Sequence, residues 1–262
     1  MSGSTSFVAK TPSPTLTLIS DAALAQTRKP TLNSIERNYQ VREEASKDWS
    51  PKLFGSIPIG EIGGKRELTI TEGKLLDNLT RDRGILGLQK FQGIYDDAFA
   101  TSESRSVPPS TIPANVEAQI QKLPVKNQEG VRTNWPTNDG HTDAFRHAYA
   151  NARLTSEFGA EWTAQFATAH EGSNPGNSTR EAMDLYNNQI GRQIAISNPN
   201  ASPAELADLV KNALDNGDLV VVNGKGHLDW SNKVAVGHHG ISIQLDNVTN
   251  AINTPAGNAS VH

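Results

Sequence analysis

The strongest constraint on the fold is the helical spacing of apolar residues along most of the chain. Leucine and aromatic side chains stand three or four positions apart through residues 71–103, with a break near Gly84. Similar spacing marks four later stretches, at about 141–157, 160–171, 179–197 and 203–215. Because this period is typical of amphipathic helices, the sequence predicts a mainly α fold, built as a single helical domain.

A small β-hairpin element is expected near the C-terminus, directly after the last of these helices. That helix has a clear start, with Ser202 as its N-cap, Pro203 at its first position and Glu205 three residues after the cap. It stops at "DNGD", and "LVVVNGKGHLDW" follows. The residues "NGKG" supply the positive φ angles that a tight hairpin turn requires.

The rest of the chain divides by composition. Residues 1–30, rich in Ser, Thr and Pro, are expected to form a flexible N-terminal tail, and residues 251–262 a frayed tail. Residues 31–70 read as an N-terminal extension, with a polar helix in "LNSIERNYQVREEASKDW" and short extended pieces after it. The helical domain then spans residues 71–250, including a short helix "ANVEAQIQKL" and a long polar loop "PVKNQEGVRTNWPTNDG".

Composition excludes several kinds of chemistry. The 262 residues include no cysteine, so disulfides, thiolate metal sites and cysteine nucleophiles are impossible, and any metal must bind His, Asp, Glu or Asn. A net charge of −4 and a pI near 6.0 argue against nucleic acid as a partner. Dinucleotide-binding, P-loop and GxSxG patterns do not occur, so we expect no nucleotide or redox cofactor.

The N-terminus shows no Sec signal, because "LTLISDAALA" is short and interrupted by polar residues. No segment approaches the ~20 apolar residues that span a bilayer. We therefore expect a soluble protein, made in the cytoplasm.

The stretch "NDGHTDAFRHAYANA" contains the most informative cluster of polar residues. In its helix Asp143, His147 and Asn151 fall at i, i+4 and i+8, so they form one stripe beside an apolar face. A solvated stripe normally carries Lys and Glu. These shorter groups are suited to coordination or hydrogen bonding.

Two further helices carry comparable groups. The helix "GAEWTAQFATAHE" ends on His170 and Glu171, and "REAMDLYNNQIGRQIA" has a polar stripe through Asp184, Asn188 and Arg192. Gly191 in the middle of that helix predicts the close approach of another backbone. Since short loops make consecutive helices neighbours, the polar stripes are expected to converge on one cleft.

These residues suggest a metal-assisted hydrolase. We expect His147, His170 and Asp184 to bind a divalent metal, Zn²⁺ or similar, which lowers the pKa of bound water. The remaining roles are Asp143 orienting a histidine, Glu171 as base and Arg146 at the oxyanion, with His141 and Asn188 as possible additional members. The pattern "HExxH" is absent, and the adjacent His238 and His239 point to opposite sides of an extended segment.

Other interpretations stay open. The histidines can be structural or capping residues, with His141 at a helix start. A metal-free site would use one histidine as general base. Glu171 alone can serve as the acid of a lysozyme-like glycoside hydrolase that cleaves peptidoglycan, and a binding or adaptor module would use the polar cleft without catalysis.

The segments "DGHTDAFRHAYANARLTSEFGAEWTAQFATAHE", "REAMDLYNNQIGR" and "LVVVNGKGHLDWS" resemble a C-terminal toxin domain of bacterial polymorphic toxins and type VI secretion effectors linked to Rhs or VgrG proteins. The resemblance covers roughly residues 70–240; the family often carries Trp where this chain has Ala150, so one packing contact is expected to differ. It implies an antibacterial effector that a secretion-machine carrier delivers into the target cell, with a cognate immunity protein as partner.

The resemblance leaves the substrate open. Together with the residues above, it predicts an effector that acts in the periplasm, at a membrane or peptidoglycan surface. The expected substrate is a phospholipid or another phosphoester-bearing molecule of the cell envelope.

Overall fold

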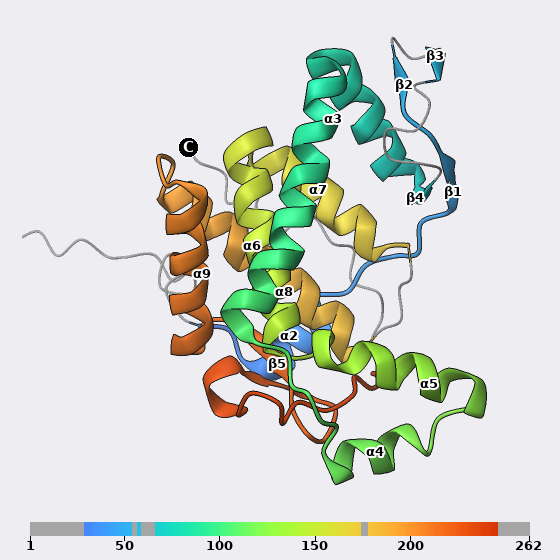
Figure 1. The fold of residues 1–262 in the computed structure, drawn as a ribbon, viewed down its shortest axis with the longest axis vertical. Coiled ribbons are helices and arrows are strands. Elements are labelled where there is room, and N and C mark those ends of the chain that lie inside the picture. Colours follow the sequence, from blue (N-terminus) through green and yellow to red (C-terminus); the bar gives the residue numbers. More distant parts are fainter. Residues whose placement is uncertain (1–28, 54–56, 59–65, 174–177, 246–262) are drawn as a thin grey trace, which may run out of the picture. The chain divides into compact units, whose positions relative to one another are not determined.

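A computed structural model describes residues 29–53, 57–58, 66–173 and 178–245. Its elements in chain order are α2 (Leu32–Asn38), β1 (Ser46–Trp49), β2 (Lys52–Leu53), β3 (Ile57–Pro58), β4 (Arg66–Thr69), α3 (Ile70–Ser106), α4 (Ala114–Ile120), α5 (Val125–Asn134), α6 (His141–Phe158), α7 (Ala160–Glu171), α8 (Thr179–Ser197), α9 (Pro203–Asn216), β5 (Val220–Val222) and β6 (Leu228–Trp230). The fold is mainly α, with a small hairpin near the C-terminus, as predicted (Figure 1). Residues 1–28 of the expected N-terminal tail, and the expected tail at 251–262, lie outside the described residues.

α6 lies at the centre of the helical domain and contacts α3, α7, α8 and α9 (Figure 1). Its apolar face, with Phe145 and Tyr149, is buried against α9 and β5. The approach of α8 is the closest, because a Cβ on Gly191 would lie 2.0 Å from the carbonyl oxygen of Ala148. The predicted reason for this glycine is confirmed: only the absence of a side chain lets the two helices meet.

α3 carries the first apolar pattern, and it begins with a capping box between Thr69 and Glu72. It is interrupted at Gly84, whose φ of 64° and ψ of −162° are not helical, so the predicted break is confirmed. Leucine and aromatic side chains from both sides of the break pack with Trp49, Leu154 and Phe166. α3 thereby joins the first β strands to α6 and α7.

The expected helix over residues 32–49 is wrong beyond Asn38. The backbone N–H of Val41 donates to the Glu181 carboxylate of α8 instead of continuing the helix. β1 then pairs antiparallel with β4, so that Trp49 lies opposite Arg66, and the buried Trp49 indole donates to Asp77 at 2.9 Å. Contacts distant in sequence therefore override a weak helical preference.

The expected polar loop before α6 is also wrong, because it contains α5. Arg132 of α5 pairs with Glu117 of α4 at 2.7 Å, and Val131 packs against the buried Trp135. No residue of α5 is itself buried, so the sequence carries no apolar stripe that would have revealed it.

α2 packs onto α8 and the C-terminal hairpin. Ile35 of α2 is fully buried beside Met183, Tyr186 and Val220. The described hairpin strands β5 and β6 pair antiparallel, from Val220 opposite Trp230 to Val222 opposite Leu228. Among the described helices, none has an apolar stretch long enough to cross a membrane.

Candidate metal centre

The polar stripes of α6 and α8 face each other across the contact made possible by Gly191. The Asn188 amide oxygen lies 3.2 Å from Nδ1 of His147 and accepts from Asn151 at 2.6 Å. One turn further along, Arg192 donates to Asn151 at 3.0 Å. The predicted convergence of the two stripes is therefore present in the fold.

At one end of this contact, Asp143, His147 and Asp184 place one possible ligand atom each within 4.8 Å of one another. His147 Nε2 lies 3.4 Å from Oδ1 of Asp143 and 3.5 Å from Oδ1 of Asp184. Charge-assisted hydrogen bonds are shorter, about 2.7–2.9 Å. Ligands about 2.1 Å from a tetrahedral ion, however, lie about 3.4 Å apart. The two distances from His147 Nε2 are compatible with ligands around one small divalent ion.

The charges around His147 favour a cation at this point. Burial alone would lower the pKa of the His147 imidazole, but Asp184, Asp143 and Glu171 together raise it to about 10. Burial raises the pKa of the Asp184 carboxyl, and the charges of Asp143 and Glu171 add to this effect. Carboxylates held this close together require a positive charge, which a proton or a metal ion can supply.

Asp143 is held rigidly. Its Oδ2 accepts from the backbone N–H of Asp139 at 2.7 Å, and its Oδ1 accepts from Arg146, which also donates to the Thr137 carbonyl at 3.0 Å. Burial would raise the pKa of the Asp143 carboxyl, but Arg146 and His147 hold it below its ordinary value. The carboxylate is therefore ionised and fixed in place, as a metal ligand needs to be.

Glu171 at the end of α7 completes the polar group. Its Oε1 lies 3.8 Å from His147 Nδ1, is buried, and has no hydrogen-bond donor; Asp184 Oδ1 is buried and without a donor as well. A cavity of about 140 Å³ opens here, with Arg146, His147, Glu171 and Asn188 among its walls. Glu171 Oε1 is therefore a buried acceptor without a donor in the wall of an open space, where it can receive a cation or a substrate.

Residues 113–218 match a protein family described as a domain of unknown function (DUF6973). The matched residues run from α4 to Asp218 and include Asp143, His147, Glu171 and Asp184. No curated protein and no solved structure matches the chain. The family likeness thus covers the candidate centre without stating what it does.

His170 is not a member of the group, contrary to its predicted role as a ligand. Its Nδ1 contacts Glu72 Oε1 of α3 at 2.9 Å, and its side chain is half-exposed. Successive residues of a helix point about 100° apart, and Glu171 is the one of the two that approaches His147. His170 lines the same small cavity but pairs with Glu72 of α3.

His141 also lies outside the group of three. It is buried at the start of α6, where Nε2 lies 2.9 Å from the carbonyl oxygen of Ser231, and burial lowers the pKa of its imidazole. The other predicted residues, namely Asp143, Arg146, His147, Glu171, Asp184 and Asn188, do converge. Asp143, expected to orient a histidine, stands among the candidate ligands instead.

Sequence reasoning missed Asp139 and Arg180. Asp139 has a φ of 64°, and its carboxylate accepts from Arg180 at 2.7 and 2.9 Å and from the Ser242 backbone at 3.1 Å. The pair fixes the turn that presents the Asp139 N–H to Asp143. The signal available was "NDG", since Asp and Asn tolerate this left-handed backbone.

Proposed function

We propose that the chain is a hydrolase that uses a divalent metal held by Asp143, His147 and Asp184. The observation that carries the proposal is the position of His147 Nε2, at 3.4 and 3.5 Å from two buried carboxylate oxygens. A set of one imidazole and two carboxylates suits Zn²⁺ or a similar ion. A bound ion of this kind lowers the pKa of water and polarises a phosphoryl or carbonyl oxygen.

The chain's own groups have separate roles. Glu171 offers a buried acceptor at the cavity, where it can take a proton from water. Arg146 holds Asp143 and lines the same cavity, which places its positive charge near a substrate anion. Asn188 contacts His147 Nδ1 and so orients the ring that offers Nε2 to the metal.

The biological setting is a further part of the proposal. The toxin resemblance runs through the same residues, from Asp143 to Asn188, and supports an antibacterial effector brought to the target periplasm by a secretion-machine carrier. A phosphoester-bearing molecule of the envelope is the substrate that fits a metal beside Arg146. A cognate immunity protein would protect the producing cell.

Metal analysis of the purified chain, combined with hydrolysis of bis(p-nitrophenyl) phosphate, tests the chemistry. We expect one divalent ion per chain, loss of hydrolysis with chelator, and recovery when Zn²⁺ is added back. The matched variants His147→Gln and Asp184→Asn should lose the ion while circular dichroism shows an intact fold. A chain that binds no divalent ion would overturn the metal role.

The alternatives predict different results. If Glu171→Gln abolishes muropeptide release from peptidoglycan and chelators have no effect, the lysozyme-like interpretation is correct. If no envelope substrate changes with any divalent ion, the chain is a binding module. Expression with and without a periplasmic export signal tests the setting: we expect growth arrest only with export, and none with His147→Gln.

A further inference from the structure

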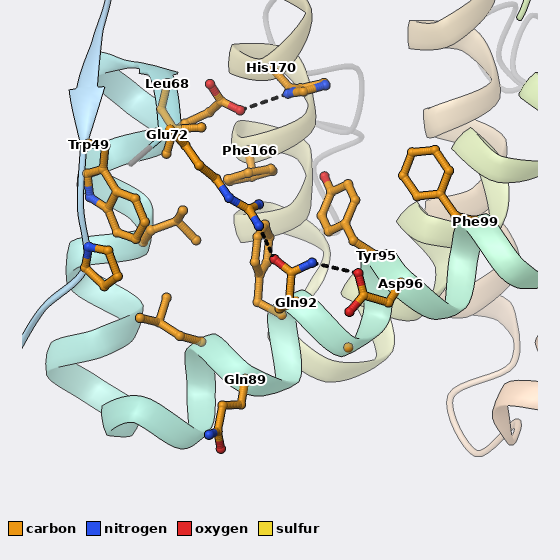
Figure 2. Close-up of a pocket in the computed structure, with 16 residues that line it drawn as sticks. Trp49, Leu68, Glu72, Gln89, Gln92, Tyr95, Asp96, Phe99, Phe166 and His170 are labelled. Carbon is orange, nitrogen blue, oxygen red and sulfur yellow. Dashed lines mark hydrogen bonds and ion pairs between the residues drawn. The ribbon is translucent and has the colours of Figure 1, made fainter. Parts of the chain in front are cut away.

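A second, larger and mainly apolar cavity adjoins the candidate metal centre. It has a volume of about 420 Å³, within the usual range of ligand pockets. Its apolar walls include Trp49, Leu68, Leu88, Phe91 and Phe166, supplied by the first β strands, α3 and α7 (Figure 2). The centre described above uses none of these residues.

The polar groups around this cavity bind one another. Arg66 donates to Gln92 at 2.5 Å, Gln92 donates to Asp96 at 2.7 Å, and His170 contacts Glu72 at 2.9 Å (Figure 2). These contacts turn the polar groups toward each other. The surface left for a ligand is mainly the apolar one.

The two cavities share part of their walls. Tyr95, Phe99 and His170 line both the apolar cavity and the smaller one that holds His147 and Glu171. The Arg146 guanidinium lies over the Phe99 ring, 4.9 Å from its centroid, although this ring is 52% exposed. A ligand can therefore extend from the apolar cavity past Phe99 to the charged groups of the centre.

We propose that the apolar cavity binds one hydrocarbon chain of a phospholipid whose phosphoester lies at the metal centre. This inference rests on the proposed function and names the substrate class of the same site. A molecule that fills both cavities needs a long apolar part joined to a compact anionic part. Arg146 and the metal complement the anion, and the leucine and aromatic walls complement the chain.

A peptide fits this pair of cavities less well. Its backbone amides would be buried among apolar walls, where an amide without a hydrogen bond costs about 1–3 kcal/mol. The polar groups nearby already bind each other. A hydrocarbon chain carries no such groups.

Isothermal titration of the full chain with n-hexyl, n-octyl and n-decyl phosphate, below their micelle concentrations, tests the inference. Because each methylene that leaves water adds to binding, the Kd should fall about tenfold for every two methylenes. The chain-length dependence should occur in metal-free and in Zn²⁺-loaded protein alike. A Kd that does not depend on chain length would overturn the inference.

Gly93 offers a matched pair of variants. It lines the cavity, and a Cβ there would meet no atom within 4 Å. Gly93 is an exposed part of the cavity wall, so Gly93→Trp should obstruct the cavity and reduce the affinity for decyl phosphate to that for hexyl phosphate, whereas Gly93→Ala should keep the full dependence. Unchanged decyl phosphate affinity in a folded Gly93→Trp variant would also contradict the inference.

The experiment separates this inference from the proposed function. If the protein binds no metal but alkyl phosphates still bind more tightly as their alkyl chain lengthens, the lipid site is supported and the metal role is wrong. If the metal-loaded chain hydrolyses bis(p-nitrophenyl) phosphate but shows no length dependence, the lipid site fails alone. Hydrolysis of phosphatidylglycerol vesicles should fall in Gly93→Trp while hydrolysis of the short ester persists.

Discussion

His147 and His239 are both largely shielded from solvent, yet their surroundings give them opposite properties. His147 lies among Asp143, Asp184 and Glu171, which raise the pKa of its imidazole to about 10. His239 stacks on Trp135 with a ring-centroid distance of 4.2 Å, and its Nε2 donates to the Trp135 carbonyl at 2.9 Å. Burial lowers the pKa of the His239 imidazole. The carboxylates around His147 favour a positive charge at that site, whereas the surroundings of His239 favour a neutral imidazole.

The difference shows how a histidine in a candidate metal site can be distinguished from a structural histidine. Each site contains a buried polar atom that has no hydrogen-bond partner. Near His147 this atom is Oδ1 of Asp184, and in the other site it is Nδ1 of His239 itself. A buried carboxylate oxygen that lacks a donor within a charged group calls for a cation. An orphan ring nitrogen in an aromatic stack only disfavours protonation.

The largest effect is expected from His147→Gln. Loss of an outer-shell partner lowers metal affinity about 10–100-fold, so loss of the ligand itself should lower it by at least about 100-fold. Equilibrium titration with Zn²⁺ measures this. The contrasting variant His239→Gln should keep metal affinity and lose about 1–3 kcal/mol of stability. If both variants lost metal equally, the distinction between the two histidines would be wrong.

Asp139→Asn should lower the metal affinity of the His147 site by less than His147→Gln does. Asn tolerates the φ of 64°, so the turn is retained while the charge that holds Arg180 is removed. We expect Zn²⁺ affinity to fall about 10–100-fold, as for other outer-shell partners. The melting temperature should change little by comparison. A fall in stability with unchanged Zn²⁺ affinity would make Asp139 a structural residue only.

The comparison also shows what the sequence can reveal. α6 to α9 were predicted to within about one residue, because apolar stripes and the Ser202 cap mark them locally. The α6 and α8 stripes predicted contacts between His147 and Asp184, since helix geometry fixes which residues share a face.

The errors arose where tertiary contacts decide. His170 and Glu171 are adjacent, and only the rotation of α7 against α3 determines that Glu171 faces the centre. α5 has no buried residue, and the course of the chain after Asn38 depends on Glu181 of α8. The role of His239 likewise depends on Trp135, which is 104 positions away.

Gly140→Ala should damage the His239 region. A Cβ on Gly140 would lie 2.6 Å from Nδ1 of His239, and the stacked ring has little room to move because Trp135 covers its face. We expect a loss of about 1–3 kcal/mol in chemical denaturation, as for other overpacked sites. The control is Gly93→Ala, where a Cβ meets nothing within 4 Å and the helix should gain about 0.5–1 kcal/mol.

The smallest effect is a pH dependence that His239 contributes. Its Nε2–H is committed to the Trp135 carbonyl, so a second proton would have to sit on the buried Nδ1, which has no acceptor. Asp139 and Asp143 favour that proton and His141 opposes it, but burial outweighs them and keeps the folded pKa below the ordinary value. Below about pH 6.5 the unfolded chain therefore binds more protons at this residue, so the free energy of unfolding falls as pH decreases. The slope from one histidine is at most about 1.4 kcal/mol per pH unit. Urea titrations between pH 7.5 and about pH 5 measure this, and the free energy of unfolding should decline less steeply for His239→Gln than for the unsubstituted chain. Equal slopes would show that the pKa of His239 is the same in the folded and unfolded chain, which would contradict the prediction.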